Sequence, residues 1–339
     1  APGGKSTLLQ SVLSAESLLV SNEVIKTRVN ILEENIIKWG ATDVVVTNND
    51  PKDFQRLTDF FDIIVVDAPC SGSGLFRRDP DAVKEWSLQN VELCSQRQQR
   101  ILADVLPALK EDGILIYSTC SYSMEEDEDI VDWLIADMHM QSRKLALKEE
   151  WSIVEAISAK GGYGYRFYPD KVEGEGFFIT ALQKRSSSGI YYAGRNKFEK
   201  AGKQEEALLK NWIKQPEQFQ YIKFKNEILA LPQNWHEEHF SLLSSMHIKK
   251  AGIKAGEIMN GALVPDHQLA VSGIVSDQVP RIELSREEAI RYLKKETIQM
   301  DIEGKGWLLV VYHGLPLGWI KLLPNRINNY YPKGWRIRK

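Results

Sequence analysis

Two cysteines in this sequence stand in settings that favour sulfur chemistry. Cys120 follows an apolar run at residues 114–117 that indicates a buried strand, and acidic residues then open a predicted helix at Glu125. Cys70 follows a second apolar run at residues 63–66 that ends in Asp67. A cysteine just beyond the carboxyl end of a parallel strand lies where open α/β sheets bind ligands. Helix N-termini and cations lower the pKa of such a thiol. A cysteine without such neighbours is usually only a small buried residue.

Acidic residues follow three of the predicted strands. The strands are at residues 18–20, 44–46 and 63–66, and the acids that follow them are Glu23, Asp50 and Asp67. Predicted helices at residues 5–13, 24–38 and 91–109 alternate with these strands. Such alternation predicts a parallel, doubly wound sheet. The three acids and Cys120 should therefore gather at one edge of it.

The chain opens with a glycine turn formed by Ala1, Pro2, Gly3, Gly4 and Lys5. Such a turn normally follows a strand, so we expect the first strand of the sheet to be missing from this sequence. One interpretation is the end of a P-loop, with Asp67 binding magnesium in an NTPase. The other is a methyltransferase, in which one carboxylate holds the ribose of S-adenosylmethionine and another faces its adenine. The acids after both intervening strands favour the methyltransferase.

The glycine turn and the two cysteine loops together resemble the Fmu/Sun family of RNA (cytosine-5) methyltransferases, over about residues 1–184. The resemblance implies that Cys120 is the nucleophile, that Cys70 assists product release and that Asp67 contacts the target base. It also implies that Ala1, Pro2, Gly3, Gly4, Lys5, Glu23, Asp50 and Asp67 bind S-adenosylmethionine. DNA cytosine methyltransferases use a Pro-Cys nucleophile, which would make Cys70 the attacking residue. A non-catalytic RNA-binding assembly factor is a further alternative.

The proposed chemistry requires these residue types. Carbon 5 of cytosine is a poor nucleophile, and a thiolate that adds to carbon 6 creates an enamine that activates it. A carboxylic acid near ring nitrogen 3 stabilises the adduct by donating a proton. Basic and aromatic residues at 76–97 and at 163–168 are candidate contacts for phosphates and for an extruded base.

The last part of the chain predicts a second RNA-binding surface. Residues 304–339 contain no acidic residue, and their Lys and Arg alternate with Trp and Tyr. The aromatic residues are expected to form the core of a small β domain. The ending resembles the PUA-like extension of RsmF-type bacterial enzymes that modify small-subunit ribosomal RNA. Strand-like pieces around residues 248 and 269, a helix at 285–295 and a strand region from residue 307 precede or form this end.

Composition limits the remaining properties of the protein. Three cysteines among 339 residues argue against a disulfide framework and predict a reducing cytoplasm. No apolar stretch approaches the length of a membrane span. The net charge of −3 gives no global nucleic-acid signature, so RNA binding must come from local patches. The histidines are not paired with cysteines as in metal sites, so no metal is predicted.

The predicted organisation is therefore an α/β protein with two domains. Residues 1–185 form a Rossmann-like, S-adenosylmethionine-dependent methyltransferase domain that lacks its first strand. Residues 186–205 form a linker, and residues 206–339 form an RNA-binding region with a PUA-like, mainly β end. We expect a cytoplasmic monomer that modifies RNA, specifically 16S ribosomal RNA or the small ribosomal subunit, without a membrane partner.

Overall fold

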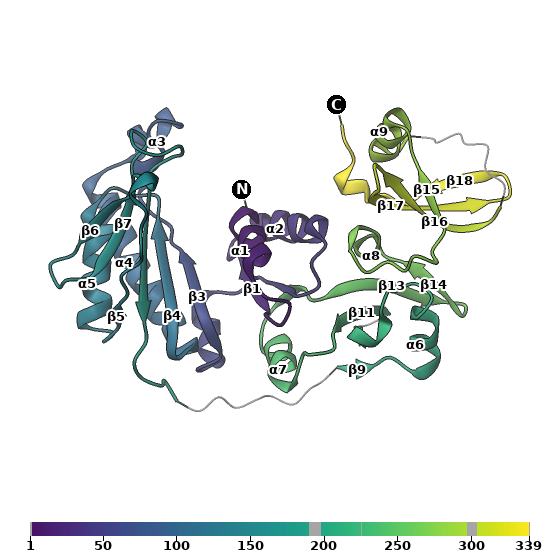
Figure 1. Cartoon of the computed structure of the whole chain (residues 1–339), viewed down its shortest axis with the longest axis horizontal. Helices are drawn as coiled ribbons and strands as arrows, with labels where there is room; N and C mark the ends of the chain where they lie inside the picture. The colour runs from purple at the N-terminus through teal and green to yellow at the C-terminus, as the bar shows by residue number, and fades with distance from the viewer. Residues whose placement is uncertain (1, 190–197, 225, 297–303, 339) are drawn as a thin grey trace. The chain divides into compact units, whose positions relative to one another are not determined.

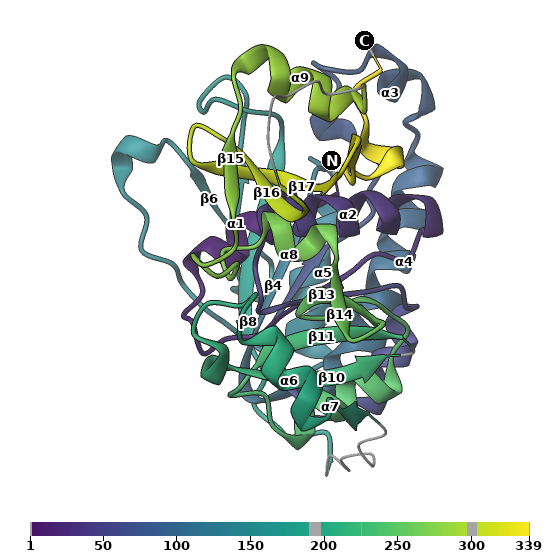
Figure 2. The ribbon, with the colours of Figure 1, turned by 90° about the vertical axis from the view of Figure 1, so that its right-hand side faces the viewer.

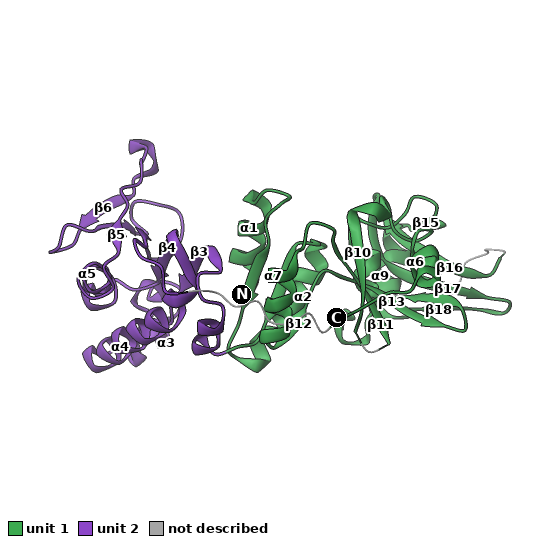
Figure 3. Cartoon of the chain, turned by 90° about the horizontal axis from the view of Figure 1, so that it is seen from below, with its two compact units in different colours: residues 1–49, 193–339 green, residues 50–192 purple. Residues whose placement is uncertain are grey.

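The computed structural model describes residues 2–189, 198–224, 226–296 and 304–338. The chain divides into two compact units, which Figure 3 colours separately. The first unit combines residues 1–49 with 193–339, and the second is the continuous stretch 50–192. The linker predicted at residues 186–205 lies partly outside the described residues, so the predicted domain boundaries stay predictions.

The first unit begins with two strands and two helices in alternation (Figure 1). They are α1 (Gly4–Val12), β1 (Leu19–Asn22), α2 (Lys26–Trp39) and β2 (Val44–Thr47). The strands pair in parallel, with Leu19 opposite Val44. Val29, Leu32 and Ile36 recur at helical spacing and pack as the buried face of α2 against β2. This layer carries the glycine turn at its start.

A strand from much later in the chain completes this sheet. β12 (Ile248–Lys250) pairs antiparallel with β2, which gives the strand order β1-β2-β12. The Lys250 side chain is buried, and its Nζ donates to the carbonyl oxygens of Gly252 at 2.6 Å and Ala41 at 3.2 Å. The ammonium group thus satisfies backbone acceptors on both sides of the β2–β12 junction.

Two further sheets make up the rest of the first unit, and Figure 2 shows their strands side by side. In the five-stranded sheet, β10, β11, β13 and β14 follow one another antiparallel, with β9 at the far edge of β10. The four-stranded sheet has the order β15-β16-β17-β18. The strands are β9 (Glu199–Lys200), β10 (Phe219–Phe224), β11 (Glu227–Pro232), β13 (Ile253–Met259), β14 (Ala262–Pro265), β15 (Arg281–Glu283), β16 (Gly306–Tyr312), β17 (Leu315–Leu323) and β18 (Arg326–Asn329). The helices are α6 (Lys203–Leu209), α7 (Glu237–Ser245), α8 (His267–Val271) and α9 (Arg286–Lys294).

The second unit holds the larger sheet, in which β3 and β4 are parallel and the other pairs are antiparallel. The main order is β3-β4-β8-β7-β6, and β5 also pairs with β8. The elements are β3 (Phe61–Asp67), α3 (Pro80–Glu85), α4 (Leu88–Val105), β4 (Leu109–Thr119), α5 (Glu128–Ala136), β5 (Gln141–Ser142), β6 (Val154–Ile157), β7 (Tyr163–Phe167) and β8 (Phe177–Gln183). Leu102 of α4, Leu115 of β4 and Leu134 of α5 are fully buried in its core.

The predicted alternation of strands and helices is confirmed for residues 4–136, as is the parallel pairing within β1–β2 and β3–β4. Among the described residues these two pairs lie in separate sheets, and β3 is an edge strand in its own sheet. Ile63 on β3 is consequently 53% exposed although it belongs to an apolar run. Local patterning predicted each strand, whereas the division into sheets depends on long-range pairing.

Two predicted elements differ from the structure. The helix predicted at residues 91–109 is α4, which begins at Leu88 because Ser87 caps it and ends at Val105 because Pro107 cannot continue it. The strand-like piece around Leu269 was wrong: this residue lies in α8, where Asp266 accepts a capping bond from Gln268 N at 2.8 Å. None of the helices in the described part of the chain is long and apolar enough to cross a membrane.

Lys250 generates a prediction about stability and pH. Burial lowers its pKa from 10.5 to about 8. The unfolded chain therefore binds more protons than the folded chain between these values, so stability should rise as the pH increases from about 8 to 10.5. Denaturant unfolding measured across this pH range should show that the free energy of unfolding of wild type rises by on the order of 3 kcal/mol relative to that of K250M, whose methionine cannot titrate.

The variant K249M controls for the loss of one positive charge on the same strand. Parallel pH profiles for wild type and K250M would show that the Lys250 ammonium is not held in a desolvated state. The sign of the pH dependence distinguishes the two cases, since a protein stabilised by a Lys in an ion pair would lose stability as the pH rises.

Candidate active site

The pairing of β3 with β4 brings the two cysteine loops together. Asp67 at the end of β3 lies opposite Ser118 near the end of β4, so the loops after both strands start side by side. The sulfur atoms of Cys70 and Cys120 lie 2.7 Å apart, and both side chains are half-buried. Asp67 is exposed beside them. The three residues predicted for the chemistry thus occupy one place in the second unit.

The two thiols have opposite acidities. A hydrogen bond from Cys70 is the main cause that lowers the pKa of Cys120, while burial and the negative charge of Asp67 act in the other direction. The same hydrogen bond, with burial, raises the pKa of Cys70. Cys120 is therefore the more acidic of the two thiols, and a thiolate is the form of cysteine that acts as a nucleophile.

The loops approach each other so closely that one position requires glycine. Gly74 N donates to Cys120 O at 2.8 Å, and Gly176 N donates to Gly74 O at 3.0 Å. A Cβ atom on Gly74 would lie 2.6 Å from both the Cys120 and the Gly176 carbonyl oxygens. Both obstacles are backbone atoms, which cannot turn away as a side chain does. The backbone of three segments is thereby fixed around Cys120.

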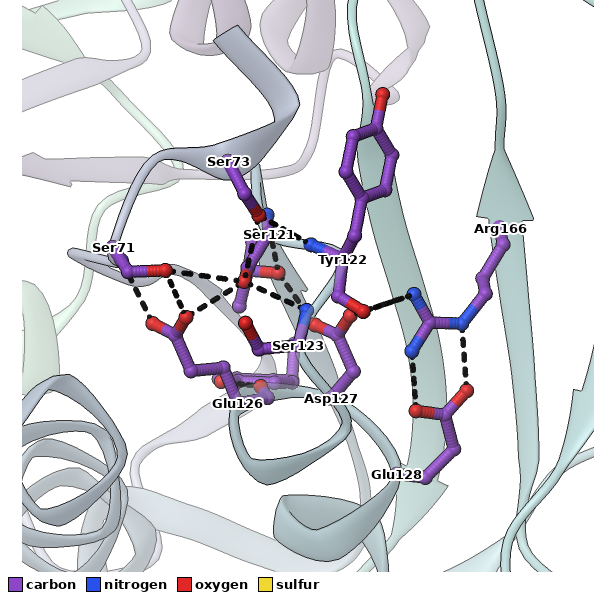
Figure 4. Close-up of polar contacts among 11 residues, drawn as sticks. Ser71, Ser73, Ser121, Tyr122, Ser123, Glu126, Asp127, Glu128 and Arg166 are labelled. Atoms are coloured by element: carbon purple, nitrogen blue, oxygen red, sulfur yellow. Dashed lines mark hydrogen bonds and ion pairs between the residues drawn. The ribbon is translucent and has the colours of Figure 1, made fainter. Parts of the chain in front are cut away.

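A buried carboxylate lies beneath both cysteine loops. Glu126 accepts hydrogen bonds from Ser71, Ser121 and Gln98, as Figure 4 shows for its contacts with Ser71 and Ser121. Ser73 also belongs to this cluster, since its Oγ accepts from Tyr122 N at 2.8 Å. The cluster joins the β3 loop to the β4 loop entirely through polar atoms.

A second polar group fixes the segment after Cys120 (Figure 4). Arg166 Nε donates to Glu128 Oε1 at 2.7 Å, and its Nη1 donates to the carbonyl of Tyr122 at 3.2 Å. Thr119 Oγ1 donates to Asp127 Oδ1 at 2.6 Å. Burial raises the pKa of Asp127 to about 8, and its Oδ2 lies 3.1 Å from Arg166 Nη1 without hydrogen-bond geometry. Arg166 thus holds the backbone next to the nucleophile.

The predicted cofactor residues of the first unit lie at the ends of its strands and helices. Gly3 adopts a left-handed conformation (φ 109°) as the N-cap of α1, which glycine allows at little cost. Glu23 accepts from Ile25 N and pairs with Arg28 at 3.1 Å. Pro2 accepts from Asn35, Gly4 and Lys5 are exposed at the start of α1, and Ala1 lies outside the described residues.

Asp50 belongs to the second unit. It is exposed and accepts a bond from Lys52 N at 3.2 Å as the N-cap of a short 3₁₀ helix, Pro51–Arg56. Glu23 and Asp50 therefore both make the local capping contacts that are common for acids in loops. Their predicted roles toward a cofactor stay predictions.

Sequence reasoning missed the polar cluster around Glu126. One signal was available, because each cysteine is followed by a serine, Ser71 and Ser121, and a buried acid close in sequence can bind both. The predicted base-stacking surface at residues 163–168 was wrong for two members. Tyr165 is fully buried in the sheet, and Arg166 is buried with its carboxylate partners. Arg77, expected to bind phosphate, pairs with Glu175.

The sequence matches two protein-family profiles. The sequence profile described as "16S rRNA methyltransferase RsmB/F" matches residues 1–183, more than half of the chain. The chain belongs to this family. A second profile, "Methyltransferase RsmF PUA domain", matches residues 279–337. The family confirms both the predicted fold class and the predicted class of enzyme, and the second match confirms the PUA-like end.

Curated relatives match the chain along almost its whole length. The "Ribosomal RNA small subunit methyltransferase F" of Aliivibrio fischeri is 30% identical over 98% of this chain and 72% of its own. The protein of the same name from Cronobacter sakazakii is 29% identical over 98% of this chain and 71% of its own. Both names describe a small-subunit ribosomal RNA methyltransferase.

Solved structures match a smaller part. The structure of "NSun6 from Pyrococcus horikoshii with SFG" is 28% identical, with a TM-score of 0.46, over 55% of this chain and 46% of that chain. A "Methyltransferase Homolog Protein" from Pyrococcus horikoshii is 29% identical, with a TM-score of 0.44, over 54% of this chain and 59% of that chain. This chain spans less than two thirds of either structure.

Gly74 generates a prediction for this site. The substitution G74A should displace the Cys120 carbonyl, at a cost of about 1–3 kcal/mol for overpacking between rigid groups. If that strain falls on the geometry of the reacting sulfur, methyl transfer to ribosomal RNA should fall by about 10- to 100-fold. The substitution G273A is the control, since nothing lies within 4 Å of a Cβ atom there. Equal rates for G74A and G273A would contradict the prediction.

Proposed function

We propose that this protein methylates carbon 5 of a cytosine in small-subunit ribosomal RNA through a covalent Cys120 adduct. The observation that carries the proposal is the 2.7 Å separation of the Cys120 and Cys70 sulfurs beside Asp67, with the pKa of Cys120 lowered by the hydrogen bond between them. Family membership supports methyl transfer to ribosomal RNA. The position of the methyl group and the covalent step rest on the chemistry of these three side chains.

The three residues divide the reaction between them. Cys120 forms a bond from its sulfur to carbon 6 of cytosine, and Asp67, if protonated on contact with the base, supplies a proton to ring nitrogen 3. The resulting enamine makes carbon 5 nucleophilic toward an electrophilic methyl group. After transfer, the proton on carbon 5 leaves to a base or water. The bond between Cys120 and carbon 6 then breaks, ring nitrogen 3 returns its proton to Asp67, and the Cys70 thiol is placed to donate a proton to the departing sulfur.

S-adenosylmethionine supplies the methyl group as a sulfonium. We assign its binding to Ala1, Pro2, Gly3, Gly4, Lys5, Glu23, Asp50 and Asp67. The left-handed Gly3 at the start of α1 supports the assignment, because a residue without Cβ lets a ligand approach the backbone. Glu23 and Asp50 follow adjacent parallel strands and bring carboxylates that suit ribose hydroxyls and an adenine amine.

The alternative functions and mechanisms differ in how well they are supported. Membership in a methyltransferase family removes the P-loop NTPase. A non-catalytic assembly factor would bind RNA without transferring a methyl group, and a Pro-Cys mechanism would exchange the roles of the two cysteines. The opposite pKa shifts favour Cys120 as the nucleophile. That the protein is a cytoplasmic monomer stays a prediction.

Separate substitution of the two cysteines tests the mechanism. C120A should abolish methyl transfer and the covalent RNA adduct, because no thiolate remains to attack carbon 6. C70A should still form the adduct and should accumulate it on cytosine RNA, because release is slowed. Denaturing gels measure the adduct, and RNA containing 5-fluorocytosine traps it, since fluorine does not leave as a proton does.

Calorimetry provides the control for this experiment. Both variants should bind S-adenosylmethionine like wild type, and none should bind ATP with magnesium specifically. An adduct that disappears in C70A and persists in C120A would establish the Pro-Cys mechanism instead. Methylation without any adduct in wild type or C70A would remove the covalent step.

The carboxyl-terminal sheet is proposed to bind RNA. Trp319 of its strand β17 is buried in the core, whereas Lys333, Arg336 and Arg338, which follow its last strand β18, are exposed. Lys339 lies outside the described residues. The names of the relatives support small-subunit ribosomal RNA as the ligand.

Removal of three exposed charges tests this role. The triple variant K333A/R336A/R338A should bind RNA more weakly, and the slope of log affinity against log salt should fall by about 2, since each phosphate contact contributes roughly 0.7. Substitution is preferable to deleting residues after Ser186, which would remove β12 from the sheet of β1 and β2. The control is K110A/K148A/K160A in the second unit. Equal salt slopes for both triple variants would contradict the assignment.

A further inference from the structure

Glu126 is a buried carboxylate in the second unit, and its side chain contacts both cysteine loops. It is fully inaccessible to solvent. Its Oε1 accepts from Ser71 N at 2.8 Å and from Gln98 Nε2 at 3.0 Å, and its Oε2 accepts from Ser71 Oγ at 2.5 Å and from Ser121 Oγ at 2.6 Å. Four donors satisfy one carboxylate, which is the condition for burying its charge.

Three of the four donors come from the residues that directly follow the two cysteines. Ser71 is adjacent to Cys70 in the chain, and Ser121 is adjacent to Cys120. Figure 4 shows both serine hydroxyls directed at the same carboxylate. Since a single side chain binds both neighbours, the position of one sulfur depends on that of the other through Glu126.

The remaining donor, Gln98, connects this carboxylate to helix α4. Gln98 lies on α4 and is fully buried, and its Nε2 donates to the Pro69 carbonyl at 3.0 Å as well as to Glu126. Tyr117 on β4 donates its hydroxyl to the Glu126 carbonyl at 2.7 Å. Glu126 is therefore held by its backbone and its side chain, from the sheet and from a helix.

We propose that Glu126 is a positioning residue, whose carboxylate holds the two cysteine loops so that the sulfurs of Cys70 and Cys120 lie within reach of each other. This inference rests on the proposed function of the two cysteines. It adds a requirement that the cysteine motifs do not contain: an acceptor-only group between the loops. The hydrogen bonds of the Glu126 carboxylate are all to protein groups, as expected of a positioning residue.

The charge of Glu126 supports geometry over electrostatics as its role. A negative charge here raises the pKa of Cys120, which opposes thiolate formation. It also raises the pKa of the neighbouring Cys94. The negative charge of this carboxylate therefore works against activation of the nucleophile. Its value to the site must come from the hydrogen bonds that it accepts.

The chemistry of glutamine makes the sharpest test. E126Q keeps the shape of the side chain and replaces one acceptor oxygen by a donor NH₂ group. In place of Oε1, that group would face Ser71 N and Gln98 Nε2, which both donate. In place of Oε2, it would face the Ser71 and Ser121 hydroxyls, which would have to turn from donating to accepting. In either orientation the charge-assisted hydrogen bonds to the carboxylate are lost. The matched control is E125Q, since Glu125 is the adjacent residue in sequence and is exposed.

The first readout is independent of methylation. Phenylarsine oxide condenses with two thiols that lie close together, forming two As–S bonds and releasing water. Wild type and E125Q should capture this reagent equally, C70A and C120A should not, and E126Q should capture it at least tenfold more slowly. A merely structural role would lower the melting temperature of E126Q without separating the two sulfurs in its folded state.

The second readout is catalysis. E126Q should lower kcat by about 10- to 100-fold, with KM for RNA and the affinity for S-adenosylmethionine within about twofold of wild type. E126D, which keeps both acceptors on a shorter side chain, should recover part of the rate. If E126Q does not fold, S71A/S121A removes the two hydroxyl donors while leaving the carboxylate, and should give the same slow arsenical capture.

The outcomes separate this inference from the proposed function. Wild-type capture rates and kcat in folded E126Q, or in S71A/S121A, would overturn the positioning role while leaving the Cys120 mechanism intact. Absence of a Cys120 adduct in wild type would overturn the mechanism, and arsenical capture would still decide whether Glu126 sets the distance between the sulfurs.

Discussion

The site depends on the register between β3 and β4. Because these strands are parallel and Asp67 pairs with Ser118, an acid at the end of one strand and a cysteine just beyond the other leave the sheet at the same level. The contacts between the two loops depend on this register. They are the pair of sulfurs, the close backbone approach at Gly74 and the Glu126 carboxylate that binds both loops. A slip of one residue would turn Val66, in place of Asp67, to the face that now carries the acid. Chemistry at this edge is thus a property of strand pairing.

The residues of the site that sequence reasoning identified are those with chemistry of their own. Cys70, Cys120 and Asp67 follow apolar runs, and the local pattern is enough to place them at strand ends. Glu126 was not identified, because its role depends on Ser71, which lies 55 positions away and carries no distinctive chemistry. Arg166 was misassigned for a related reason. A basic residue between aromatic ones resembles a nucleic-acid surface, and only the fold shows that its carboxylate partners are buried with it.

The fold shows the same division between local and distant information. Apolar periodicity predicted α2, β2 and α9 to within a few residues, because each pattern is contained in its own segment, whereas β4 begins at Leu109, where the preceding helix was predicted to continue. The five-stranded sheet of β9, β10, β11, β13 and β14 and the place of β12 beside β2 were not predicted. A three-residue strand has almost no periodicity of its own. It is defined by its partner, and the partner lies in another part of the sequence.

The pairing of β12 with β2 also affects how the protein is made. Asn49 Oδ1 accepts from the backbone of His247, a residue 198 positions later. Ribosomes add about 5–20 residues per second, so roughly 10 to 40 seconds separate the synthesis of the two strands. Throughout that interval the free edge of β2 offers unpaired backbone groups to any neighbouring chain. In the nascent chain the edge of β2 therefore stays unpaired until β12 has been synthesised, for a time set by the speed of translation.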